Sequence, residues 1–91
     1  MHPLDATSPK WRIAQGTIDV IYIHPSNEWS LATMTYDGHP ALGMRWNGDL
    51  NDPRDLGYPS ARGNGAWFIF PPEVEPMMLA YMAVTKVPEP A

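Results

Sequence analysis

Residues 29–46, WSLATMTYDGHPALGMRW, predict two antiparallel strands joined by a tight turn, and this hairpin decides the fold. The first strand covers residues 29–36 and the second covers residues 41–46. Asp37-Gly38 favours the turn between them, because glycine accepts the positive φ that a two-residue hairpin requires. Side chains of the first strand alternate, with Trp29, Leu31 and Thr33 on one face and Ala32, Met34 and Tyr36 on the other.

A further strand precedes this hairpin at residues 17–23, TIDVIYI, where β-branched and aromatic residues dominate. Its predicted faces are Ile18, Val20 and Tyr22 on one side and Ile21 and Ile23 on the other. Because both faces carry apolar side chains, we expect this strand to lie in the middle of the sheet. The turn formers of residues 24–27, HPSN, separate it from the hairpin.

The C-terminal third predicts one more strand and one helix. Residues 66–70, AWFIF, are heavily apolar and end at two prolines, which is typical of a short strand. Apolar residues then recur at three- and four-residue spacing over residues 76–86, which favours a helix. A fifth strand is the competing interpretation, because Val84 and Thr85 favour extended structure. The predicted fold is α+β, an antiparallel sheet of about four strands at residues 17–23, 29–36, 41–46 and 66–70 with a C-terminal helix at about 76–86.

The totals predict one folded domain over residues 1–91, because 44% of the residues are apolar. Residues 1–10 and 88–91 are polar or rich in proline, and we expect both to be disordered tails. The formal charge of -4 disfavours broad electrostatic binding to nucleic acid or to an anionic membrane. There is no cysteine, which excludes disulfides and thiolate chemistry. Because nothing in the sequence indicates an oxidising compartment, we expect a cytoplasmic location.

No motif predicts catalysis or metal binding. The histidines His2, His24 and His39 are scattered, and no HExxH-type spacing brings ligands together. Neither Ser26 nor Ser60 lies in a GxSxG elbow, so a serine nucleophile is not indicated. We therefore expect no enzymatic activity, no cofactor and no metal.

The residues that follow Asp49 do not fit the pattern of a calcium-binding loop. Pro53, Arg54 and Ser60 stand where such a loop needs a side-chain oxygen, a glycine and a bidentate glutamate. The acidic residues of the segment are better interpreted as turn and cap formers, namely Asp49, Asp52 and Asp55.

The long irregular segment at residues 47–65 is the predicted functional surface, because structureless loops of this length are uncommon in compact domains. Arginine beside tryptophan or tyrosine is enriched at binding hot spots. The candidate binding residues are Arg45, Trp46, Asn47, Arg54, Tyr58 and Arg62. A structural interpretation competes: Trp46 and Trp67 pack in the core while Arg45 reaches outward.

Three short motifs in this region carry a resemblance. They are GMRWNG at residues 43–48, GYPSARG at residues 57–63 and WFIFP at residues 67–71. Together they resemble small uncharacterised bacterial and mobile-element proteins with the pattern G-x-RWNG, G-x-P-x-RG and WF-x-x-P. The resemblance implies an accessory protein that binds and blocks a larger host complex, as anti-CRISPR proteins do.

We therefore expect a non-catalytic protein-binding module, an inhibitor of a host defence complex, whose partner is a larger protein or protein complex. The alternative is a single-stranded nucleic-acid binder that uses Arg45, Arg62 and aromatic residues on a sheet face. The net charge disfavours this alternative, and no membrane partner is expected. A homodimer through an open sheet edge is a further alternative.

Overall fold

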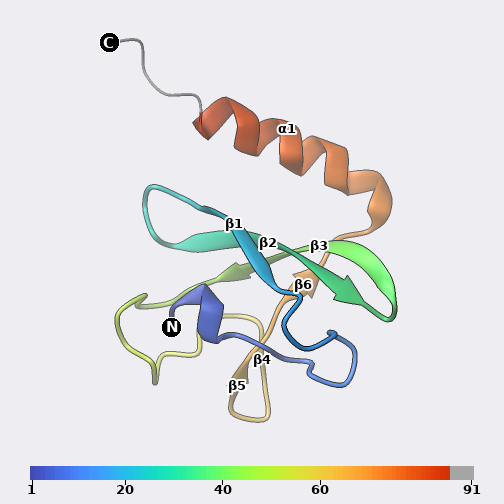
Figure 1. The fold of residues 1–91 in the computed structure, drawn as a ribbon. Helices are drawn as coiled ribbons and strands as arrows, with labels where there is room; N and C mark the ends of the chain where they lie inside the picture. The colour runs from blue at the N-terminus through green and yellow to red at the C-terminus, as the bar shows by residue number, and fades with distance from the viewer. Residues whose placement is uncertain (87–91) are drawn as a thin grey trace.

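The computed structural model describes residues 1–86, with the backbone alone for residues 85 and 86, and it has an α+β fold (Figure 1). The main sheet is antiparallel, in the order β1 (Asp19–Ile23), β2 (Trp29–Tyr36), β3 (His39–Trp46) and β6 (Phe68–Ile69). A second, two-stranded sheet pairs β4 (Ser60–Ala61) with β5 (Asn64–Gly65). Two short 3₁₀ turns, η1 (Pro3–Asp5) and η2 (Pro72–Val74), precede β1 and the helix α1 (Glu75–Lys86), respectively.

The β2–β3 hairpin forms the middle of the sheet, as its sequence predicts. Pairing is continuous from Trp29 opposite Trp46 to Tyr36 opposite His39. Asp37 and Gly38 both have positive φ, at 51° and 81°, which is the backbone of a tight hairpin turn. The strand predicted at residues 41–46 begins two residues earlier, because the hairpin remains paired up to its turn.

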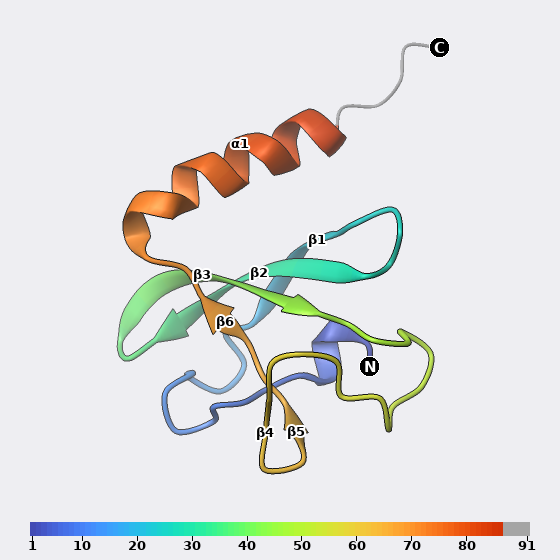
Figure 2. The same ribbon diagram turned by 180° about the vertical axis from the view of Figure 1, so that it is seen from behind.

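The two faces of the sheet bury two separate apolar clusters. One contains Met1, Ala6, Ile13, Ala32, Met34 and Trp67, and lies between the sheet and the N-terminal segment. The other contains Tyr22, Leu31 and Leu42, and α1 covers it with Met78 and Met82. Figures 1 and 2 show α1 on one side of the sheet and the N-terminal segment with β4 and β5 on the opposite side.

The N-terminal segment corrects one prediction, because residues 1–10 are not a disordered tail. Ala6 is fully buried and Ser8 is buried. The Ser8 nitrogen donates to the Gly65 oxygen at 3.1 Å, and the Trp67 nitrogen donates to the Ser8 oxygen at 3.2 Å. The segment therefore covers a sheet face that would otherwise be open to water. The other predicted tail, at residues 88–91, lies outside the described residues.

Strand β1 corrects two predictions. It is an edge strand rather than a central one. Its register shifts between Val20 and Tyr22, where Ile21 forms a bulge. The bulge moves Tyr22 to the α1 side, while Val20 stays on the N-terminal side, so these two side chains do not share a face. A bulge also increases the local twist, which discourages edge-to-edge pairing with another sheet.

The last strand is shorter than predicted and the helix agrees with its pattern. Ala66 leaves the main sheet and forms a parallel bridge with Ser8, so that the strand paired with β3 shortens to Phe68–Ile69. The Phe70 nitrogen still donates to the Leu42 oxygen of β3 at 2.9 Å. The helix begins at Glu75, one residue before its predicted start, and the competing fifth strand is wrong. Within residues 1–86, no helix is long and apolar enough to cross a membrane.

Trp67 is the largest aromatic side chain buried in the cluster beside the N-terminal segment, so its removal tests how that core is packed. It is 4% exposed, and its indole nitrogen donates to the Ala6 oxygen at 2.7 Å. We expect Trp67→Ala to lower the free energy of unfolding by about 3–5 kcal/mol, because it removes a large ring from a packed core. Urea unfolding followed by circular dichroism measures this change.

Trp11→Ala is the matched control, because Trp11 is 82% exposed. Its expected change is within about 1 kcal/mol, the size of an exposed cation–π contact such as the one with Arg12. Equal losses of stability in the two variants would contradict the assignment of Trp67 to the core.

Candidate functional site

The six predicted binding residues separate into three groups. Arg45 and Asn47 are completely buried. Trp46 and Tyr58 are exposed and lie together, and the remaining two, Arg54 and Arg62, are exposed elsewhere on the loop. The division between Arg45 and its neighbour Trp46 follows from strand geometry, because successive side chains of β3 point to opposite faces.

Arg45 joins the sheet to the loop from inside the protein. Its guanidinium donates to the Ala66 oxygen at 2.7 Å and to the Leu56 oxygen, and it lies 6.0 Å from the centre of the Trp67 ring. Burial lowers the pKa of Arg45, and the negative charge of Asp55 acts in the opposite direction. The expected outward orientation of Arg45 is wrong, and the side chain offers no surface to a partner.

Asn47 holds the end of β3 against the turn before β2. Its amide nitrogen donates to the Ser30 hydroxyl at 2.8 Å and to the Asn27 oxygen at 3.2 Å. The backbone nitrogen of Asn47 donates to the Glu28 oxygen at 2.7 Å. The backbone oxygen of Asn47 accepts from the N-terminal amine of Met1 at 2.7 Å. Asn47 therefore positions its neighbours and cannot itself reach a partner.

The segment after β3 is shaped by its aspartates, in agreement with their interpretation as turn formers. One carboxylate oxygen of Asp55 accepts from the Asp49 nitrogen at 2.8 Å and the other accepts from the Gly57 nitrogen at 3.1 Å. Gly57 has a φ of 64°, and a Cβ at this position would collide with the Trp46 oxygen. Only glycine therefore allows the loop to return so close to β3.

This return brings Tyr58 beside Trp46. The Trp46 nitrogen donates to the Tyr58 oxygen at 2.7 Å, and the Tyr58 nitrogen donates to the Trp46 oxygen at 2.9 Å. On the same strand, Met44 pairs with Phe68 of β6. Residues directly opposite each other in an antiparallel pair project to the same face. The three aromatic side chains therefore come from three segments and meet on one face.

Together these side chains form a groove of about 300 Å³, which we call the aromatic groove. Its lining residues are Met44, Arg45, Trp46, Tyr58, Pro59 and Phe68. Trp46 is 49% exposed, Tyr58 is 69% exposed and Phe68 is 54% exposed. Arg45 contributes only the floor, since its side chain is buried.

The sequence interpretation missed Met44, Pro59 and Phe68. The signal for Phe68 was present in the alternation of residues 66–70, because neighbouring side chains of a strand face opposite ways. A buried Trp67 places Phe68 on the other face. The contribution of Met44 and Pro59 depends on the path of the loop, for which the sequence holds no periodic signal.

Arg54 and Arg62 do not join this groove. Arg54 pairs with Asp52 at 3.5 Å in the exposed loop. Arg62 lies at the β4–β5 turn with a φ of 51°, and it lines a separate hollow together with Lys10 and Trp11.

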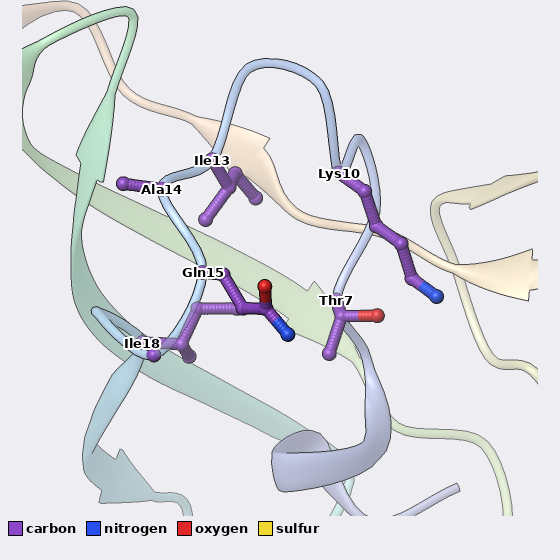
Figure 3. Close-up of a pocket in the computed structure, with 7 residues that line it drawn as sticks. Thr7, Lys10, Ile13, Ala14, Gln15 and Ile18 are labelled. Atoms are coloured by element: carbon purple, nitrogen blue, oxygen red, sulfur yellow. The ribbon is translucent and has the colours of Figure 1, made fainter.

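A further hollow of about 290 Å³ lies beside the N-terminal segment (Figure 3). Ile13 and Ile18 supply its apolar side, and the Gln15 amide turns toward Thr7. Figure 3 shows Lys10 extending away from Ile13 and Gln15. Among the residues that the structure describes, no three His, Asp or Glu side chains converge as metal ligands would.

No protein-family model, no curated protein and no solved structure matches this chain. The resemblance to mobile-element proteins therefore stays a prediction.

We expect Arg45→Lys to destabilise the protein, because an ammonium group lacks the planar fork that donates to two separated carbonyl oxygens. Loss of one charge-assisted hydrogen bond corresponds to about 1.5–3 kcal/mol in the free energy of unfolding. Arg54→Lys is the control, because Arg54 is exposed, and its expected change is below about 0.5 kcal/mol. An unchanged urea midpoint for Arg45→Lys would refute the role of Arg45 in joining the loop to the sheet.

Asp55 makes the loop sensitive to acid. Hydrogen bonds from the Asp49 and Gly57 nitrogens lower its pKa from the ordinary 3.8, with smaller contributions from the Met1 amine and Arg45. A lowered folded-state pKa gives stability that is present above the unfolded-state value and lost as pH falls through the folded-state value. Urea midpoints should therefore fall in wild type below about pH 4.

Asp55→Asn should lower the urea midpoint at pH 7 and flatten this acid-induced decrease. The control is Asp19→Asn, a change on the exposed part of β1, which should keep the wild-type pH profile. An identical acid slope in wild type and Asp55→Asn would show that this carboxylate does not hold the loop.

Proposed function

We propose that the protein is a non-catalytic protein-binding module that receives an apolar segment of a partner in the aromatic groove. The observation that carries the proposal is the convergence of Trp46, Tyr58 and Phe68 on one concave surface, each about half exposed or more. Tryptophan and tyrosine dominate binding hot spots, because each buries a large area at a small loss of conformational freedom.

Packing does not account for these exposed rings. A chain of 91 residues buries only about 60–65% of the surface that it exposes when unfolded, so it has few large apolar side chains to spare. Leaving three aromatic rings in water forgoes their contribution to the core. A site that recovers this apolar area on binding explains their placement.

The groove is rigid before any partner arrives. Trp46 and Tyr58 are joined by two backbone hydrogen bonds, and Phe68 is paired with Met44 in the sheet. Buried Arg45 holds the loop from below through Leu56. Association costs less conformational entropy when the contact residues are ordered beforehand, so this rigidity favours binding.

The charge beside the groove defines the partner's chemistry. Glu28 lines a shallow hollow together with Gly48 and with Trp46, which also lines the aromatic groove. Its carboxylate makes no ion pair within the described residues and accepts only a long 3.4 Å hydrogen bond from Ser26. We infer that the partner segment places an apolar side chain in the groove and a Lys or Arg against Trp46 and Glu28.

The same charge argues against nucleic acid in the aromatic groove, since phosphates would lie near Glu28 with no exposed cation among the lining residues. The mobile-element resemblance of residues 43–48 and 57–63 indicates where the partner should be sought. We propose a host defence complex, which the protein would inhibit by occupying one of its surfaces.

Affinity capture from a bacterial lysate, followed by titration calorimetry with the purified partner, tests this function. We expect Tyr58→Ala and Phe68→Ala to weaken binding by about 30-fold each, equivalent to about 2 kcal/mol for a hot-spot residue. Their urea midpoints should change little, because both side chains are more than half exposed.

Trp11→Ala is the control for an exposed aromatic residue outside the groove and should retain the partner. Undiminished affinity in both groove variants would reject the proposed site. Loss of binding in Trp11→Ala alone would place the protein contact on the opposite side of the molecule.

A further inference from the structure

A second surface, separate from the aromatic groove, carries its own chemistry. The N-terminal segment and the β4–β5 turn line an open hollow of about 330 Å³, which is within the size range of small-molecule sites. We call it the basic hollow, and its lining residues are Ser8, Pro9, Lys10, Trp11, Ala61, Arg62 and Asn64. None of these residues is acidic, although the chain as a whole has a net charge of -4.

Two of the four exposed basic side chains in residues 1–84 of this acidic protein line the basic hollow. Among residues 1–84, the exposed basic side chains are Lys10, Arg12, Arg54 and Arg62. Arg54 is far along the loop and pairs with Asp52, and Arg12 pairs with Asp37 at 3.3 Å. Lys10 and Arg62 have no ion pair within the described part of the chain, so both cations are available to an anionic ligand.

Arg62 occupies a backbone position that its residue type disfavours. Its φ of 51° is in the left-handed region, and it precedes Gly63, whose φ is 79°. Such turns favour Asn, Asp or Gly, and an ordinary side chain there costs on the order of 1 kcal/mol. No internal hydrogen bond of the guanidinium offsets this cost in residues 1–86, so packing does not explain the arginine.

Trp11 supplies a flat apolar surface beside these cations. It is 82% exposed, and the Arg12 guanidinium lies 4.8 Å from the ring centre. Unpaired bases stack on exposed aromatic rings of this kind, and Lys and Arg contact their phosphates. An acidic peptide would satisfy the two cations but would leave the indole ring without a matching planar partner.

We propose that the basic hollow binds a nucleotide unit, with its base stacked on Trp11 and its phosphate held by Lys10 and Arg62. The unit is either a free nucleotide or part of a single strand, because both present the same base and phosphate. This differs from the expected nucleic-acid surface, which contained Arg45 on a sheet face. Arg45 is buried. Lys10 lies in the segment that was expected to be disordered, and Trp11 follows it directly.

Fluorescence anisotropy of a fluorescein-labelled dT12 strand at low salt tests the proposal with the intact chain. We expect saturable binding that weakens with salt, with a slope of log K against log salt of about -1.4 for two phosphate contacts on a single strand. Trp11→Ala should weaken binding on the order of 10-fold or more, as for other stacking aromatics. Arg62→Asn should weaken binding and flatten the slope, and asparagine suits the positive φ, so the turn is preserved.

Two matched controls locate the site. Arg54→Asn removes another exposed arginine, which lies outside the hollow, and Tyr58→Ala removes an exposed aromatic residue of the aromatic groove. Both variants should bind dT12 as wild type does. Absence of binding at low salt would overturn the proposal. A greater loss of affinity for dT12 in Tyr58→Ala than in Trp11→Ala would also overturn it, because the oligonucleotide would then bind in the aromatic groove.

Competitors identify the ligand class. If thymidine 5′-monophosphate displaces dT12 at millimolar concentration, the hollow is a site for a free nucleotide. If only an unlabelled strand displaces dT12, the hollow is a site for a single strand. An abasic strand of equal length should bind at least several-fold more weakly than dT12. Equal binding of the abasic strand, or equal displacement by an oligo-aspartate peptide, would reduce the hollow to a general anion site and reject base stacking.

Discussion

The buried guanidinium of Arg45 is the constraint on which the rest of the structure depends. It donates to the Leu56 and Ala66 oxygens, which belong to two segments separated by the β4–β5 hairpin, and it lies near the Trp67 ring. An arginine cannot release its proton to escape burial, so it keeps these carbonyl partners in place. One side chain of β3 thereby ties the segment at residues 47–65, which includes the β4–β5 hairpin, to the sheet.

The exposed surface follows from that internal bond. Because β3 alternates, a side chain that points inward at Arg45 forces Trp46 outward. Gly57 lets the loop approach Trp46 closely enough for Tyr58 to pair with it, and Met44 positions Phe68 in the same way. The aromatic groove is therefore a product of strand register and of one glycine, with its contact residues spread over segments that are distant in sequence.

The sequence predicts the parts of this fold that periodicity and turn chemistry control, namely the β2–β3 hairpin, its alternation and the C-terminal helix. It fails where one contact overrides a pattern. The bulge at Ile21 shifts Tyr22 to the other face, and no residue in TIDVIYI marks that shift. The N-terminal segment is polar, yet its backbone pairs with Gly65 and Trp67. The competing structural interpretation, with Trp46 in the core and Arg45 reaching outward, interchanges the two residues, because hydropathy places arginine in water and tryptophan in the core.

This interchange also explains how a small chain can leave aromatic rings exposed. Hydrogen bonds replace part of the missing apolar packing: Asn47 joins β3 to the turn at Asn27, and Asp55 accepts from two loop nitrogens. Such polar contacts are directional, so they hold the loop in one conformation, which apolar packing alone does less well. Arginine and asparagine on the inside and tryptophan on the outside are therefore two consequences of one arrangement, in which polar bonds supply rigidity and apolar surface remains for recognition.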